Sequence, residues 1–172
     1  MKLQGKKIIV LVEDLYQEIE LWYPLLRIRD EGAEVTTVGT EAGVTYKSKT
    51  GYPVTSDAAS RDVDVSDYDG IIIPGGYAPD LMRRHEATVK LVKDGFEQGK
   101  AVAAICHAGW MLTSADIVNG KKVTGFFAIR DDLLHAGAQY EDAEVVVDGN
   151  LITSRKPDDL PAFCREIIRA LS

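Results

Sequence analysis

The chain has 172 residues, about the length of one average domain, and its 45% hydrophobic and 27% charged residues are typical of globular proteins and exclude a disordered or fibrous chain. The net charge is −7 and no basic cluster interrupts the acidic background, so no nucleic acid partner is expected. No apolar stretch approaches the roughly 20 residues that cross a bilayer, and the apolar run at 8–12 is too short for a signal peptide. We therefore expect one cytoplasmic domain over residues 1–172, with no membrane partner and with its two cysteines reduced.

Apolar runs alternate along the chain with segments of helical spacing. Strands are predicted at 6–12, 33–38, 71–73 and 101–105, and helices near 19–28, 87–99 and 160–171. The polar segment 39–65 predicts only short strands, and Asp148-Gly149-Asn150 predicts a hairpin turn. Asp158 is the expected N-cap of the last helix. Because the strands are apolar throughout, the pattern indicates a flavodoxin-like, doubly wound α/β fold, a mostly parallel sheet with helices on both faces.

Cys106 is the leading candidate for a nucleophile. The strand at 101–105 runs directly into Cys106 and then into a short helical segment, which is the arrangement of a nucleophile elbow. The amides at the start of that helix are expected to favour the thiolate and to stabilise an oxyanion. The alternative is that Cys106 is a small buried apolar residue, the commoner role of free cysteines and the one expected for Cys164 on the last helix.

Three further groups are candidates for the same edge of the sheet. Gly75 and Gly76 end the strand at 71–73, and their amides are expected to contribute to an oxyanion hole. His107 follows the cysteine and reaches the thiol only if the turn swings its ring round. Glu18 and Glu20 follow the first strand, and one of them is placed to bond to the thiol, although an acidic first helical turn is the commoner explanation. The interpretation at this stage is a cysteine site without a metal, since no CxxC or HxxxH spacing occurs.

The sequence gives little support to binding folds of other kinds. No GxGxxG or GxxxxGK[ST] motif occurs, so nucleotide binding is disfavoured and no cofactor is expected. Glu13 and Asp14 at the end of the first strand suggest a receiver or flavodoxin-like binding domain. That interpretation leaves the Cys106-His107 pair unexplained.

The motifs together resemble the PfpI-type intracellular cysteine peptidases. The resemblance rests on Glu20 before Pro24, IIIPGGYAPDLMR at 71–83, AICHAGWMLTSA at 104–115 and VVVDGNLITSRKPDDLPAF at 145–163. That family belongs to the glutamine-amidotransferase-like superfamily, with the parkinsonism-associated deglycase and bacterial general stress proteins. The resemblance implies a single PfpI-type domain and an activity among peptidase, glyoxalase III-like and protein deglycase reactions, or a stress-protective role.

Carried over to this chain, the resemblance assigns a role to each motif residue. Cys106 is the nucleophile, His107 its partner and Glu20 the acid that contacts the sulfur, while the amides of Gly76 and His107 form the oxyanion hole. Asp80 matches an acid that reaches the Cys-His pair of a neighbouring subunit, which implies a homo-oligomer, a dimer or larger.

The chain departs from the family pattern at three positions. Trp110 ends the Ala-Gly-Trp that stands where family peptidases have Gly-Pro-Gln, Phe126 replaces a tyrosine, and Gln17 replaces an additional glutamate. These departures put the particular reaction in question. The expected substrate is a peptide or a small dicarbonyl compound, and the alternative is a non-catalytic redox sensor with an oxidisable Cys106.

Overall fold

The fold is an α/β arrangement around one seven-stranded sheet, seen in a computed structural model that describes residues 1–172. The strand order is β10-β11-β7-β6-β1-β2-β5, and every neighbouring pair is parallel except β10 with β11. The strands of the sheet are β1 Lys7–Leu11, β2 Glu34–Gly39, β5 Ala58–Ala59, β6 Gly70–Ile73, β7 Ala101–Ile105, β10 Val146–Asp148 and β11 Leu151–Ser154. The mostly parallel, doubly wound sheet that the apolar strands predict is confirmed.

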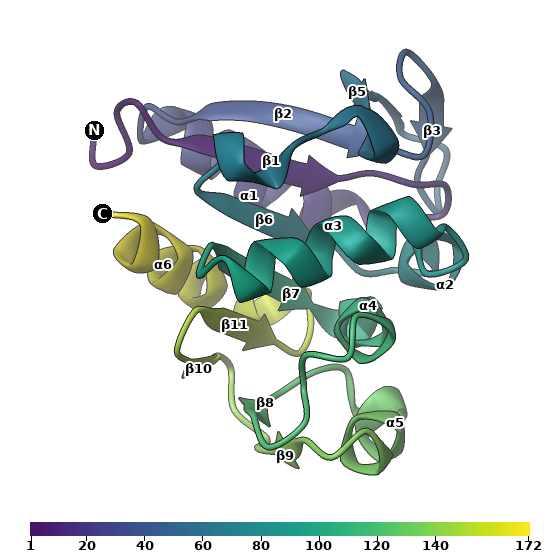
Figure 1. Ribbon diagram of the computed structural model, residues 1–172, viewed down its shortest axis with the longest axis vertical. Coiled ribbons are helices and arrows are strands. Elements are labelled where there is room, and N and C mark those ends of the chain that lie inside the picture. The colour runs from purple at the N-terminus through teal and green to yellow at the C-terminus, as the bar shows by residue number, and fades with distance from the viewer.

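Helices cover both faces of the sheet. They are α1 Glu18–Asp30, α2 Ala78–Met82, α3 Glu86–Glu97, α4 Gly109–Ser114, α5 Arg130–His135 and α6 Leu160–Leu171. Figure 1 shows α3 in front of the sheet and α1 behind it, where α1 packs on α6. Two short pairs lie outside the main sheet: β3 Thr45–Lys47 with β4 Pro53–Thr55, and β8 Lys122–Val123 with β9 Gln139–Tyr140.

The central strands bring distant parts of the chain to one edge. β6 lies between β1 and β7, with Ile71 opposite both Ile9 and Val102. All residues of β6 and β7 are buried, because helices cover them on both faces. Since parallel strands end at the same edge, the loops after β1, β6 and β7 meet there.

The last helix begins differently from the prediction. Residues Pro157–Asp159 form a short 3-10 turn before α6, so Asp158 is not its N-cap; Asp159 holds that position without capping through its side chain. Its carboxylate is instead buried and accepts bonds from Arg155, at 2.9 Å from Nε and 3.0 Å from Nη2. A buried ion pair therefore replaces the expected cap.

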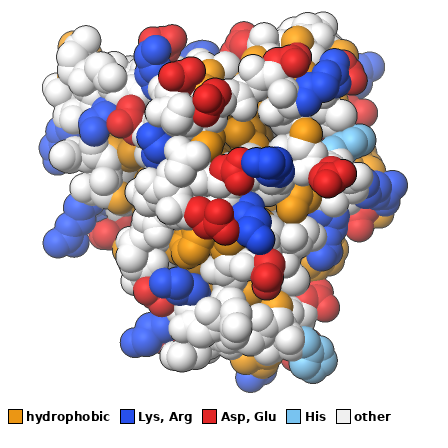
Figure 2. Space-filling view, viewed as in Figure 1, with side chains coloured by type: hydrophobic (Ala, Val, Ile, Leu, Met, Phe, Trp, Pro, Cys, Tyr) orange, Lys and Arg blue, Asp and Glu red, His pale blue; other side chains and the backbone are white.

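The surface carries charges of both signs. On the face in Figure 2, acidic and basic side chains are interspersed, with apolar side chains visible between them. None of the six α-helices combines the length and the apolar character that a membrane-spanning helix requires.

Candidate active site

Cys106 directly follows β7 and is the first residue of a 3-10 segment, Cys106–Ala108, that leads into α4. Its φ is +62°, in the left-handed region that residues with a Cβ rarely adopt. Strain of this kind persists only where the surrounding packing holds it, and it is common at functional sites. The predicted nucleophile elbow is thus present in the backbone itself.

Only glycine fits at position 75, because the side chains of Glu20 and Cys106 lie against its backbone. A Cβ at Gly75 would collide with the Glu20 carboxylate and would lie 2.7 Å from the Cys106 Cβ. The Gly75 N–H donates to Glu20 Oε2 at 2.9 Å. The glycine therefore lets the loop after β6 hold the acid against the thiol.

This hydrogen bond corrects one prediction about the oxyanion hole. An N–H that already donates to a carboxylate is not free to stabilise an oxyanion, so Gly75 belongs to the support of Glu20. The amides of Gly76 and His107 point toward the Cys106 sulfur instead. Gly76 has a φ of +83°, and a Cβ there would lie 2.5 Å from the Gln17 nitrogen.

Glu20 is fully buried beside the thiol. Its Oε1 has no N–H or O–H donor, although Oε2 is satisfied by Gly75. Burial raises the pKa of the Glu20 carboxyl to about 7. Near neutral pH this side chain therefore holds a proton for part of the time, and when it is ionised the Cys106 thiol beside it donates to the carboxylate.

The pKa of the Cys106 thiol is not lowered as the helix N-terminus predicts. Burial and then the charge of Glu20 raise it to about 12, although the amides of Gly76 and His107 act in the opposite direction. The amide dipoles are outweighed because a second negative charge beside ionised Glu20 is costly in a water-poor site. Cys106 and Glu20 consequently act as one coupled pair that shares a proton.

The turn does swing His107 round to the thiol. Its Nδ1 lies 3.2 Å from the Cys106 sulfur, and its ring stacks on Phe126 with 4.8 Å between centroids. Trp110 packs edge-on against the same ring at 5.1 Å. Burial and the charge of Lys49 lower the pKa of His107, so the imidazole is neutral near pH 7 and can accept a proton.

Asp80 stands apart from this group within the chain. It lies in α2, where Arg84 pairs with its carboxylate and lowers its pKa. No hydrogen bond links Asp80 to His107, and His107 Nε2 bonds to no group of this chain. The chain alone thus brings together Cys106, His107 and Glu20, but not Asp80.

Two further charged residues, Lys49 and Glu18, shape the site. The charge of Lys49 acts on both Glu20 and His107, lowering the pKa of each. Although burial opposes it, hydrogen bonds from Ser48 and Thr50 hold the pKa of Glu18 at about 2. Glu18 therefore clamps the loop on which Lys49 is carried. Lys49 lies in a polar, turn-rich segment where no motif marks it, whereas Glu18, the other acid considered for a bond to the thiol, begins α1 and bonds to this loop instead.

The three departures have visible structural roles. Gln17 caps α1, since its side chain accepts the Glu20 N–H at 2.9 Å. Trp110 donates from its ring N–H to Asp132 at 2.8 Å, which fixes the ring beside His107. Phe126 supplies the ring stacked on His107 without a hydroxyl.

Glu13 and Asp14, the candidates for a receiver-like binding site, make hydrogen bonds within the fold. Glu13 accepts from the Thr40 hydroxyl at 2.9 Å and Asp14 accepts from the Lys47 amide at 2.8 Å. No cluster of three or more His, Cys, Asp or Glu side chains is arranged to hold a metal ion.

A strained cysteine elbow at the carboxyl edge of a parallel sheet, with a buried acid and an imidazole beside the sulfur, defines a cysteine-centred α/β protein. Residues 6–170 match the DJ-1/PfpI family, and the chain belongs to that family.

Named relatives agree with this assignment. The chain is 45% identical to the putative cysteine protease YraA of Bacillus subtilis over 97% of this chain and 99% of the relative. It is 44% identical to the deglycase TK1284 of Thermococcus kodakarensis over 96% and 99%. A solved two-domain protein of Anabaena variabilis with DJ-1/ThiJ/PfpI-like and ferritin-like domains superimposes with a TM-score of 0.96 at 42% identity, over 97% of this chain and 48% of that longer chain.

Proposed function

We propose that the protein is a cysteine-dependent enzyme in which Cys106 attacks the carbonyl carbon of a small dicarbonyl compound, in a deglycase or glyoxalase-like reaction that protects against stress. The observation that carries this proposal is the left-handed Cys106 elbow closed by Glu20 on one side and His107 on the other. Only 8% of Cys106 is exposed, and aromatic rings flank His107. A recessed sulfur favours small carbonyl compounds over extended peptides. Relatives named deglycases support the same choice.

The first chemical step is the addition of sulfur to carbon. Cys106 gives its proton to neutral His107 or to ionised Glu20, the C–S bond forms, and the carbonyl π pair moves to oxygen. The amides of Gly76 and His107 face the sulfur and stabilise the alkoxide. Return of the proton to that oxygen completes a hemithioacetal when the substrate is an aldehyde.

A peptidase activity is the second form of the same chemistry, and the relative named a putative cysteine protease favours it. Here the attack gives an acyl enzyme, and water releases it after the amine has left with a proton from His107.

Turnover of methylglyoxal and of a fluorogenic peptide by the wild type, Cys106→Ser and Cys164→Ser tests both reactions. We expect methylglyoxal consumption that disappears with Cys106→Ser and persists with Cys164→Ser. Consumption that survives Cys106→Ser would contradict the proposal. Absence of any turnover, with oxidation of Cys106 by peroxide, would favour the redox sensor instead, because protonated Glu20 is placed to donate to a sulfinate oxygen.

We also propose that the active form is a homo-oligomer in which a second copy supplies Asp80. In cysteine-histidine sites the third residue orients the ring through the nitrogen that does not face the sulfur. Here that nitrogen is Nε2, which has no hydrogen-bond partner in the chain. Asp80 lies at the same edge of the sheet, in the helix after the Gly75-Gly76 loop.

Subunit mixing tests the shared site. Cys106→Ser and Asp80→Ala subunits, each inactive alone, are expected to regain part of the activity when mixed, because a mixed interface pairs one intact Cys106-His107 with one intact Asp80. Subunits that exchange without any recovery, or a fully active monomer, would exclude it. A mixing experiment without recovery would not contradict the proposed attack by Cys106.

A further inference from the structure

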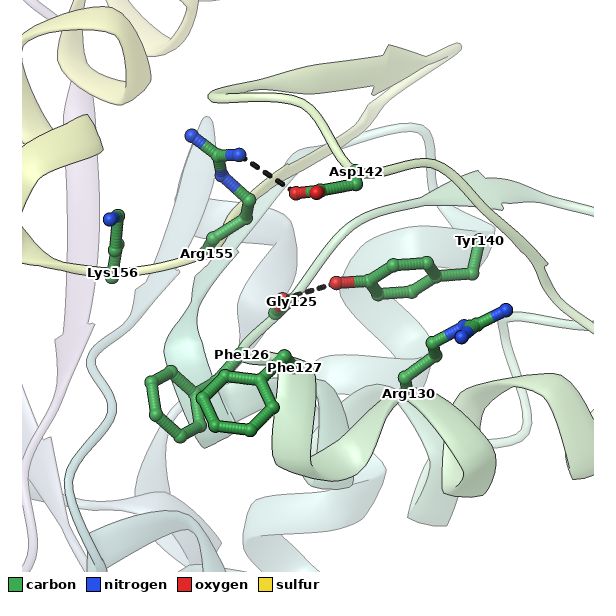
Figure 3. Close-up of a pocket in the computed structure, with 8 residues that line it drawn as sticks. All are labelled: Gly125, Phe126, Phe127, Arg130, Tyr140, Asp142, Arg155 and Lys156. Carbon is green, nitrogen blue, oxygen red and sulfur yellow. Dashed lines mark hydrogen bonds and ion pairs between the residues drawn. The ribbon is translucent and has the colours of Figure 1, made fainter.

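A surface cavity of about 570 Å³ has Phe126, the ring that stacks on His107, in its wall. Its wall is formed by residues of the segment 125–130, by Tyr140 and Asp142, and by Arg155 and Lys156 directly after β11. In Figure 3 Tyr140 lies across the cavity, with its hydroxyl toward the Gly125 carbonyl, to which it donates at 2.9 Å. The site described above uses none of the cavity's polar side chains.

The cavity is coupled to the reacting centre through one residue. The Phe126 ring stacks on His107 at 4.8 Å, and its N–H donates to the Cys106 carbonyl at 3.2 Å. A ligand that fills the cavity therefore contacts the same ring that packs on the catalytic imidazole. This places the cavity one side chain, Phe126, away from the imidazole of His107.

The cavity carries positive charge on a chain whose net charge is −7. Three cationic side chains line it, Arg130, Arg155 and Lys156, against a single acid, Asp142. Arg155 carries one positive charge but binds two carboxylates, Asp142 at 2.7 Å and buried Asp159, so these three side chains together carry a net charge of −1 and Arg155 offers none to a ligand. The positive charge that remains comes from Arg130 and Lys156.

Arg130 is the guanidinium without a partner. It has no carboxylate within salt-bridge distance, and its only aromatic contact is the Tyr140 ring, 5.9 Å from its central carbon to the ring centroid. Lys156 lies 3.4 Å from Asp158, but both side chains are exposed, and exposed pairs of this kind interact weakly. In Figure 3 these two cations lie on opposite sides of the cavity.

The remaining walls are aromatic. Phe127 is 75% exposed, which is unusual for a side chain of its size, and its ring lies 4.7 Å from that of Phe126. With Tyr140 these rings offer flat apolar surface between two available cations. A ligand that matches both features has an apolar body and one anionic group.

We propose that this cavity binds the carboxylate or phosphate of a substrate whose carbonyl group reacts at Cys106, with Arg130 as the principal anion-binding residue. The inference extends the proposed function by naming a substrate class: carbonyl compounds that carry an acidic group on an apolar body. Phe126 then serves as the shared wall between the anion subsite and the reacting centre.

Direct binding tests the subsite without requiring turnover. Benzoate, phenyl phosphate and benzyl alcohol are titrated into the wild type, Arg130→Gln and the matched control Arg29→Gln, which removes another exposed arginine that has no ion pair. Amide shifts of Gly125 and Phe126 in NMR spectra report on the cavity. We expect Arg130→Gln to weaken binding of an anion about tenfold or more, Arg29→Gln to leave it unchanged, and benzyl alcohol to bind weakly to all three proteins.

The two anions distinguish the source of the charge. Tighter binding of benzoate assigns a carboxylate ligand, and tighter binding of phenyl phosphate assigns a phosphate. No amide shifts with either anion, or equal weakening by Arg130→Gln and Arg29→Gln, would overturn the subsite. An oligomer that dissociates in Arg130→Gln while anion binding is unchanged would assign the cavity to a subunit interface, and would also overturn it.

Methylglyoxal turnover separates this inference from the function on which it rests. Anion binding that depends on Arg130 in a protein without turnover would support the subsite and reject the proposed function. Normal methylglyoxal turnover with no anion binding would do the reverse, since methylglyoxal is neutral and does not need Arg130.

Discussion

Cys106 and Cys164 are both buried thiols, and burial raises the pKa of each to about 12. Their surroundings differ completely. Cys164 lies within α6, packed against the core, whereas Cys106 occupies a left-handed turn beside an acid, an imidazole and two amides. The comparison teaches that the pKa of the thiol alone does not distinguish the proposed nucleophile from a cysteine of the core. What distinguishes Cys106 is the set of groups placed to accept its proton and to stabilise the product of attack.

The largest difference between the two cysteines is expected in turnover. Cys106→Ser should reduce kcat/KM for methylglyoxal by at least about 10³-fold, because serine is a far weaker nucleophile in a site built for sulfur. Cys164→Ser should leave kcat/KM nearly unchanged, as its side chain lies on α6 away from the elbow. Steady-state kinetics of both variants measure this, and a comparable loss in the two would remove the distinction.

Alkylation should also separate the two thiols. We expect iodoacetamide to modify Cys106 before Cys164, since Cys106 is 8% exposed against 2% and has His107 to accept its proton. Because the pKa of Cys106 is raised, the rate should increase with pH above neutrality. Mass spectrometry of digests at timed intervals gives both rates. Equal rates in the folded protein would count against the special status of Cys106.

Glu20→Gln sharpens the comparison through stability. Unfolded Glu20 ionises from about pH 4.5, but the folded carboxyl keeps its proton up to about pH 7. Below pH 4.5 the carboxyl is protonated in both states and costs the fold nothing. Between pH 4.5 and pH 7 the free energy of unfolding of the wild type therefore falls by about 3 kcal/mol. Glu20→Gln lacks that loss. Urea unfolding of both proteins at several pH values checks the difference, and parallel curves would show that Glu20 is ionised throughout.

The smallest effect is expected at Lys49. Burial is the main cause of the lowered pKa of His107, and the Lys49 charge adds to it, so Lys49→Gln should raise that pKa slightly. Lys47→Gln is a matched control on the same exposed segment. NMR titration of the His107 ring at low ionic strength measures the change, because salt screens an exposed charge. A shift that is equal in both variants would assign the effect to general charge.

Much of the site could be located from the chain alone. The apolar strands, the glycine pair after 71–73 and the cysteine after 101–105 identify the edge where the site lies, because parallel strands end together. Glu20, His107 and Gly76 are all found at the sulfur. The same local reasoning predicted an N-cap at Asp158 and a lowered pKa for Cys106, and both predictions were wrong. A 3-10 turn over Pro157–Asp159 moves the start of α6 past Asp158, and burial together with the charge of Glu20 raises the pKa of Cys106.

The sequence by itself determined the α/β class, the order of buried strands and the position of the elbow, because these follow from apolar periodicity and from turn residues that act over a few positions. Only the tertiary structure decided which acceptor occupies the Gly75 amide, that Glu20 keeps its proton to about pH 7, and that Lys49 reaches the site from a loop with no motif. Those properties depend on burial and on charges brought together by the packing of distant segments. Neither can be read from neighbours along the chain.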